Sequence, residues 1–168
     1  MGLIRPDRRA VLLGLAATGL AGRASAEDVT DLDWRDLLPA DDQSLPGSLA
    51  GLLPHDESSL AARQPMSTGM RTDWNGQIVR LSGFIVPIDY KGTGVTAFIL
   101  VPYVGACVHV PPPPANQLVF VTTGTPYESA GLFEAVTVTG MFGTASTSTQ
   151  LAEIGYALSA EDIRPYRA

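Results

Sequence analysis

Cysteine, histidine and lysine are almost missing from this chain of 168 residues. It holds one cysteine, Cys107, one lysine, Lys91, and two histidines. A single cysteine cannot form a disulfide within the chain, so its thiol must be buried, metal-bound, catalytic or paired with another chain. The shortage of basic residues leaves a net charge of −6. Because nucleic-acid binding depends on neutralising phosphates, so acidic a chain is a poor partner for nucleic acid.

Long apolar runs are also missing, and this excludes a membrane span outside the N-terminus. The apolar run Ala10–Ala21 is shorter than the roughly 20 residues that a spanning helix needs. It follows the pair Arg8 and Arg9 and precedes Ala24–Ala26, which has the form of an export cleavage site. Residues 1–26 are therefore predicted to be an export signal. The arginine pair favours the twin-arginine route over the general secretory route.

Removal of this signal leaves 142 residues, the size of one ordinary domain. The remaining chain has a charge of about −9, because the signal takes four arginines and one aspartate. Residues 27–76 are acidic and interrupted by prolines, so they are predicted to be an irregular arm. Within the arm, Leu32–Pro39 is predicted to form a short amphipathic turn that anchors on the core. Residues 77–168 are predicted to be a β-barrel core that forms one domain with the arm.

The core shows short apolar or alternating segments separated by turn residues, and this pattern is typical of strands. The predicted strands are Ile78–Val86, Val95–Val101, Leu118–Thr122, Ala135–Phe142 and Ile154–Leu158, with a further strand around Cys107. Gly83 within the first of them indicates a bulge or bend. Residues 143–149 are predicted to be a linker. Short strands, glycine bends and no long helix predict an all-β fold. A small, partly open OB-like barrel is favoured, and a β-sandwich is the alternative.

The segment Val101–Gln117 carries the most chemical information. Cys107 and His109 stand two residues apart, and side chains two apart in a strand point to one face. The alternating apolar residues around them predict such a strand, with the thiol and imidazole presented together. A thiolate and an imidazole form a ligand pair for zinc or copper(I).

Two residues do not complete a metal site, since structural zinc usually takes four protein ligands. His55 and the carboxylate of Asp89 are the candidate additional ligands. A thiol enzyme built on Cys107, His109 and Asn116 is an alternative. Side chains at i and i+2 of a strand lie about 7 Å apart, however, and a metal bridges that gap more easily than a hydrogen bond. The plainest alternative is that the cysteine is a small buried hydrophobe.

The four consecutive prolines predict a rigid polyproline II rod, because proline has no N–H for a sheet ladder. They are Pro111, Pro112, Pro113 and Pro114. Such a rod can be a docking surface, which would make the protein a metal-free interaction module, or it can stiffen the wall of a site. The amides of Asn116 and Gln117 are candidates to orient His109 or a ligand. More often, such amides satisfy backbone groups.

Three segments also resemble a known bacterial family, domain of unknown function 3299: Leu32–Pro39, Val79–Pro87 and Val101–Gln117. The resemblance covers nearly all of the chain after the signal. It implies an exported protein of Gram-negative bacteria, and it suggests a link to gene clusters for ABC-type transporters, some of them zinc-responsive. The family motif singles out the following residues: Cys107, His109, Pro111, Pro112, Pro113, Pro114, Asn116 and Gln117. His55 lies outside that motif.

Together, these observations predict a periplasmic metal-binding accessory protein that serves a transporter in zinc or copper handling. Enzymatic activity is not the favoured interpretation.

Overall fold

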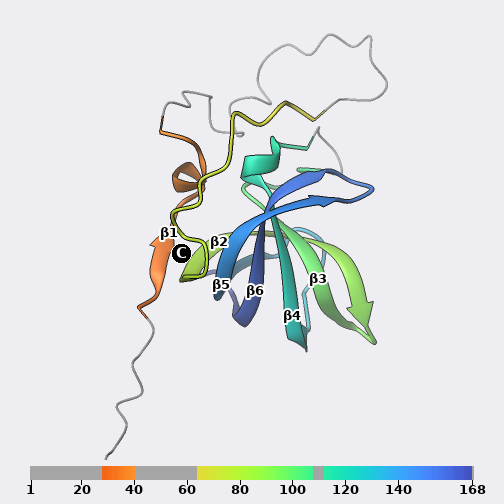
Figure 1. Cartoon of the computed structure of the whole chain (residues 1–168). Coiled ribbons are helices and arrows are strands. Elements are labelled where there is room, and N and C mark those ends of the chain that lie inside the picture. Colours follow the sequence, from red (N-terminus) through yellow and green to blue (C-terminus); the bar gives the residue numbers. More distant parts are fainter. Residues whose placement is uncertain (1–27, 41–63, 108–111, 168) are drawn as a thin grey trace, which may run out of the picture.

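Five strands close into a barrel, and a sixth short strand lies beside it (Figure 1). The computed structural model describes residues 28–40, 64–107 and 112–167. The barrel strands are β2 (Ile78–Lys91), β3 (Gly94–Val101), β4 (Val119–Tyr127), β5 (Ala135–Ser148) and β6 (Glu153–Pro165). They pair in the order β2-β3-β4-β6-β5, and β5 returns to β2. All barrel pairs are antiparallel except β4 with β6. The predicted all-β, OB-like barrel is confirmed.

The barrel interior is filled by alternate side chains of all five strands. In β3, for example, Phe98 and Leu100 are fully buried in this inner cluster. Successive side chains of a strand point to opposite faces, so the residues between them face outward. Burial of apolar surface contributes roughly 25 cal/mol per Å², so this cluster is the main source of stability. Its fourteen buried members are Leu37, Val79, Leu81, Ile85, Val95, Phe98, Leu100, Val119, Val121, Val136, Val138, Phe142, Tyr156 and Leu158.

A second apolar cluster lies on the outside of β2, β3, β4 and β6. Ile99 and Val101 of β3 belong to it and are fully buried, although they point away from the barrel interior. They are covered by the chain that follows β3, which contributes Ala106 and the half-buried Tyr103 and Cys107. We call this set the outer cluster. Its other members are Val86, Leu118, Ala152 and Ile154, with Phe84, Phe120 and Phe133 packed against them.

Helical structure in the described residues is confined to two short 3-10 turns, η1 (Trp34–Leu37) and η2 (Ala115–Gln117). The amphipathic turn predicted for Leu32–Pro39 is therefore confirmed, and Leu37 is fully buried as its anchor. Just before it, β1 (Thr30–Leu32) pairs in parallel with β2, a strand that the sequence did not predict. No helix in the part of the chain that the structure describes is long and apolar enough to cross a membrane.

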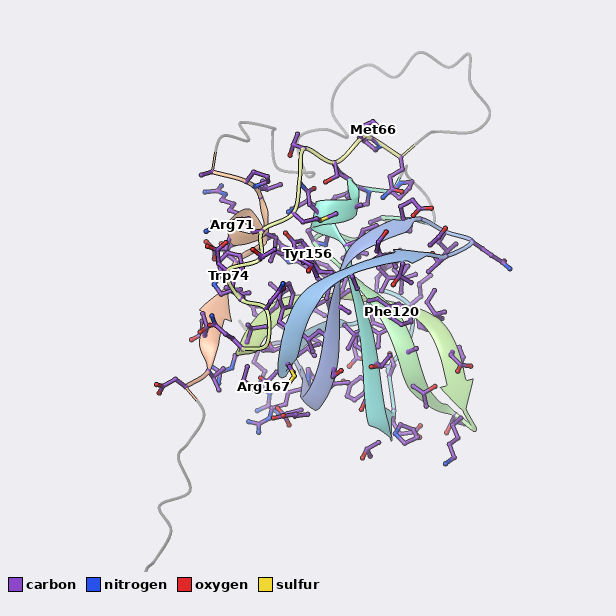
Figure 2. All side chains as sticks on the ribbon, viewed as in Figure 1. Met66, Arg71, Trp74, Phe120, Tyr156 and Arg167 are labelled. Carbon is purple, nitrogen blue, oxygen red and sulfur yellow. The ribbon has the colours of Figure 1, made fainter. Side chains whose placement is uncertain are left out.

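One hydroxyl group joins both described parts of the arm to the barrel. The Tyr156 hydroxyl donates to the carbonyl oxygen of Leu37 at 2.8 Å and accepts from the backbone N–H of Arg71 at 2.8 Å. Its ring packs on Phe142 with centroids 5.1 Å apart. Arg71 also covers the ring of Trp74, with its guanidinium carbon 4.6 Å from the ring centre. Figure 2 shows Arg71 and Trp74 next to each other on the arm, beside η1.

Four strand predictions were wrong in their extent. β2 runs to Lys91 and β4 runs to Tyr127, beyond the predicted ends at Val86 and Thr122. Residues 143–149 do not form a linker, because β5 continues to Ser148 and pairs with the first residues of β6. Thr147 lies opposite Ile154 and Ser148 opposite Glu153. The small polar residues of this stretch resemble a linker in composition, but a partner strand supplies the backbone hydrogen bonds that composition does not reveal. Likewise β6 runs on to Pro165, well beyond the predicted end at Leu158.

We predict that Tyr156→Phe destabilises the protein by about 1–3 kcal/mol, because it leaves a buried carbonyl and a backbone N–H without their partner. The measurement is the free energy of unfolding in urea. Tyr90→Phe is the matched control, since the Tyr90 residue is 56% exposed. Limited proteolysis of the arm should accelerate only in Tyr156→Phe. Equal stability of the two variants would show that the hydroxyl does not hold the arm.

Candidate functional site

The chain around Cys107 is a turn and not the strand that the sequence predicted. β3 ends at Val101, and Pro102 has no N–H to extend the ladder. Gly105 and Cys107 both adopt left-handed backbone conformations, with φ of 94° and 67°. Val104 is 60% exposed, whereas Ala106 is fully buried, so the apolar alternation reflects a turn folded back onto the barrel. His109 and the other residues of 108–111 lie outside the described part of the chain, so its position relative to the thiol stays a prediction.

The Cys107 thiol is half-buried against aromatic and aliphatic side chains of the outer cluster. This burial raises the pKa of Cys107 to about 11, so the thiol is protonated at neutral pH. Reactive cysteines usually have a lowered pKa and lie near positive charge. The electrostatics therefore disfavour a thiol nucleophile in the metal-free protein.

Backbone strain is concentrated at the same place. In the described residues, the only non-glycine positions with positive φ are Cys107 and Phe133, and both side chains pack in the outer cluster. A bulky residue rarely adopts this conformation, which costs of order 1–3 kcal/mol and persists only where the surrounding structure imposes it. The outer cluster therefore holds two side chains at positions that the local sequence does not favour.

The turn covers the barrel face on which OB barrels generally bind their ligands. That face is formed by the second and third barrel strands and by nearby loops. Here these strands are β3 and β4, and their outer side chains, Val101 and Phe120, belong to the outer cluster. Ala152, from the connection between β5 and β6, joins the same cluster. The chain thus brings its only thiol to the usual OB ligand face and closes much of that face.

The described prolines are packed and are not a free rod. Pro113 is buried, and its carbonyl oxygen accepts a hydrogen bond from the side-chain amide of Gln64 at 2.8 Å. The same amide donates to the carbonyl of Glu153 and accepts from its N–H, both at 2.8 Å. This part of the proline run therefore serves as a wall between the arm and β6. Pro111 lies outside the described residues.

The two amides that follow the prolines hold the arm. Gln117 donates from Nε2 to the carbonyl of Trp34 at 2.9 Å, which fixes η1. Asn116 donates from Nδ2 to the carbonyl of Gly69 at 3.0 Å and to Thr68 Oγ1 at 3.3 Å. Asn116 and Gln117 therefore clamp the arm to the barrel. The sequence signal for this role was only the general tendency of such amides to satisfy backbone groups.

One atom of this clamp has no partner. Asn116 is 1% exposed, yet its Oδ1 is the one buried side-chain polar atom without a hydrogen-bond partner among residues 28–40, 64–107 and 112–167. Buried polar groups are nearly always hydrogen-bonded, so an orphaned acceptor indicates that a donor belongs beside it. Asn116 is the last residue but one of the segment Val101–Gln117, which carries the thiol and the imidazole.

The additional metal ligands considered from the sequence are not gathered in the described residues. Within those ranges, no three side chains of His, Cys, Asp or Glu lie close enough together to hold a metal ion. Asp89 sits at a bulge of β2, exposed, and its Oδ1 accepts from the backbone N–H of Tyr90 at 2.9 Å. His55 lies outside the described residues, so its part in a site is still a prediction.

Comparison with known proteins identifies one family. The family model described as "Protein of unknown function (DUF3299)" matches residues 34–165. The crystal structure of a DUF3299 family protein from Pseudomonas aeruginosa PAO1 is 34% identical, with a TM-score of 0.69. The match covers 84% of this chain and 98% of the Pseudomonas chain. None of the curated proteins matches this chain.

We predict that Cys107 reacts with iodoacetamide on the order of 100-fold more slowly in the folded protein than in urea at about pH 8, because only the thiolate reacts. The rate should rise with pH towards a midpoint near 11. Mass spectrometry of the alkylated chain gives both rates. A folded-state midpoint below the ordinary thiol pKa of about 8.5 would restore the nucleophile interpretation.

Proposed function

Since the chain belongs to the DUF3299 family, whose description gives no activity, we propose from its own residues that it is a periplasmic metal-binding accessory protein of an ABC-type transporter. Cys107 and His109 are the proposed ligands, and zinc or copper(I) is the proposed ion. The single observation that carries this proposal is the orphaned Oδ1 of Asn116, at the end of the segment that holds both ligands.

A metal-bound imidazole coordinates through one nitrogen and usually donates the N–H of the other to a carboxylate, carbonyl or amide oxygen. The oxygen of Asn116 is a buried acceptor that still needs a donor. We therefore assign Asn116 as the residue that orients His109. Its Nδ2 donates to the carbonyl of Gly69, so Oδ1 and Nδ2 cannot exchange places without losing that bond.

The thiol also suits a metal better than it suits catalysis. A pKa raised by burial leaves Cys107 inert towards electrophiles at neutral pH. A soft cation can displace the proton, and the thiolate charge is then compensated in an apolar setting. The competing idea of a metal-free docking rod is weakened, because Pro113 is buried and hydrogen-bonded by Gln64.

The predicted export signal is the basis for the proposed periplasmic location. Residues 1–26 have the pattern of an export signal, and the family resemblance implies an exported protein. The association with an ABC-type transporter rests on that resemblance alone. An acidic protein with one ion-binding site per chain would suit the delivery or capture of a metal beside a transporter.

We predict one zinc or copper(I) ion per mature chain. Binding should weaken as the pH falls, because protons compete for the thiolate, and more steeply below a pH of about 6.5, where protons also compete for the imidazole. Calorimetry should show that Cys107→Ser loses most of the affinity and that His109→Ala also weakens it. Asn116→Ala should weaken it 10–100-fold, as is typical of groups that orient a ligand. His55→Ala tests whether the arm contributes.

The matched control is Asn75→Ala, which removes an amide bonded to Thr144 on the edge of β5. It should leave metal affinity unchanged. If neither ion gives heat above the buffer blank, with copper(I) handled anaerobically, or if Cys107→Ser binds as tightly as the wild type, the metal function is wrong.

We predict that replacing Arg8 and Arg9 by lysine abolishes export, because the twin-arginine route reads the arginine pair. The measurement is the amount of protein in the periplasmic fraction, with Arg5→Lys as the control. Unchanged periplasmic levels in the double variant would assign export to the general secretory route.

A further inference from the structure

A cleft of about 550 Å³ lies between η1 and β2, and its volume is in the range of ligand sites. Trp34 forms one wall, while Ser82 and Phe84 of β2 form another. Tyr166, near the end of the chain, also lines it. The lining includes neither Cys107 nor the proline run, so this cleft is separate from the proposed metal site.

The Trp34 wall is fixed by hydrogen bonds. The indole Nε1 donates to the carbonyl of Ser82 at 2.8 Å, and the backbone carbonyl of Trp34 accepts from Gln117 at 2.9 Å. A Cβ on Gly83 would lie 2.9 Å from the indole ring and 2.8 Å from the carbonyl of Val101, so this close packing requires glycine. A wall held in this way needs little ordering when a ligand binds, and preorganisation of this kind favours affinity.

The charges around the cleft are of one sign. Asp31, Asp33 and Asp36 line it, and no Lys, Arg or His is among its lining residues. Two of these carboxylates are partly compensated. Asp31 pairs with Arg80 at 2.8 Å. The pKa of the Arg71 guanidinium is raised mainly by its hydrogen bond to Asp73, and the charge of Asp36 raises it further.

The third carboxylate is available to a ligand. Asp33 is exposed and forms no ion pair within the described residues. Its backbone N–H donates to Asp36 Oδ2 at 2.8 Å, as part of a capping box with Asp36. The rim of the cleft therefore offers a carboxylate that forms no ion pair among residues 28–40, 64–107 and 112–167.

Aromatic side chains line the same cleft, namely Trp34, Phe84 and Tyr166. The indole N–H is already used, so Trp34 offers a ring and not a donor. A carboxylate beside aromatic rings is suited to a guanidinium group, which stacks on rings and binds carboxylates through paired N–H groups. An aliphatic stem can lie along the apolar part of the cleft while its charged end reaches the rim.

The strand next to the cleft has an open edge. β1 is the end strand of the sheet and pairs with β2 on one side only, and Figure 1 shows it at the margin of the molecule. An exposed edge of this kind can accept an extended peptide through main-chain hydrogen bonds. Asp31 and Leu32 belong both to this edge and to the cleft lining. A peptide added to the edge would thus bring its side chains to the cleft.

We propose that this cleft docks an extended segment of a partner protein, in which an arginine lies beside an apolar residue. The arginine stacks on Trp34 and binds the carboxylates of Asp33 and Asp36, and the apolar neighbour packs near Phe84. The proposal does not depend on metal binding.

The test uses the mature chain and a blocked peptide of about five residues that alternates arginine and leucine, with citrulline in place of arginine as the neutral control. Calorimetry should show binding that weakens as ionic strength rises, since the charges are exposed. The citrulline peptide should bind at least about tenfold more weakly, because it lacks the charge-assisted bonds. Amide NMR shifts should cluster at residues 31–36 and 82–84.

Asp33→Asn with Asp36→Asn should reproduce the loss of about tenfold for the arginine peptide. Asn at position 36 still offers an oxygen to the Asp33 backbone N–H, so the fold should be kept, and the circular dichroism spectrum checks this. Glu161→Gln on β6, outside the cleft lining, is the matched control and should bind like the wild type.

Three results would overturn the proposal: no heat with the arginine peptide, equal binding of the citrulline peptide, or NMR shifts elsewhere on the barrel. Self-association of the mature chain that Tyr166→Ser abolishes would instead assign the cleft to a second copy of the chain and would equally reject a foreign partner.

Discussion

The hydroxyl of Tyr156 is the interaction on which the arrangement of arm and barrel depends. A buried tyrosine in the barrel wall accepts from Arg71 and donates to Leu37, and these two residues belong to arm segments far apart in the sequence. Both contacts are to backbone atoms, so they fix the path of the chain and not only one side chain. With the path set, Gln117 can reach Trp34 and Asn116 can reach Gly69. The wall of the cleft and the surroundings of the candidate metal site both follow from this one junction.

The barrel uses its two faces in different ways. The inner cluster draws on every strand and closes the barrel, whereas the outer cluster is covered by the turn that carries Cys107. In OB barrels, this outer face generally receives the ligand. Here the chain covers the face with its own aromatic residues and its only thiol. The outer surface of β3 and β4 is thereby covered by this turn.

A strand was predictable from the sequence where a run of apolar residues has the length of the strand itself. β3 is almost wholly apolar and was predicted nearly to the residue, because no other arrangement would bury it. The turn at Cys107 was mistaken for a strand, since alternation cannot reveal that Gly105 and Cys107 have positive φ. The outer end of β5 was missed because a partner strand, and not its own composition, stabilises it. For the candidate metal site, the sequence identified Cys107, His109 and Asn116 by their chemical types. It could not reveal that the side-chain oxygen of Asn116 lacks a hydrogen-bond partner, because that depends on packing.

The Gln64 amide occupies the N–H and the carbonyl of Glu153, where the edge of β6 extends past the first residue of β4. The neighbouring chain there is Pro112–Pro114, which has no N–H and cannot pair with that edge. The Gln64 side chain therefore makes the two backbone hydrogen bonds that a residue of a neighbouring strand would make. An uncovered edge is where β-proteins recruit one another into aggregates. By covering this short edge of β6, Gln64 thus protects the barrel against edge-to-edge association.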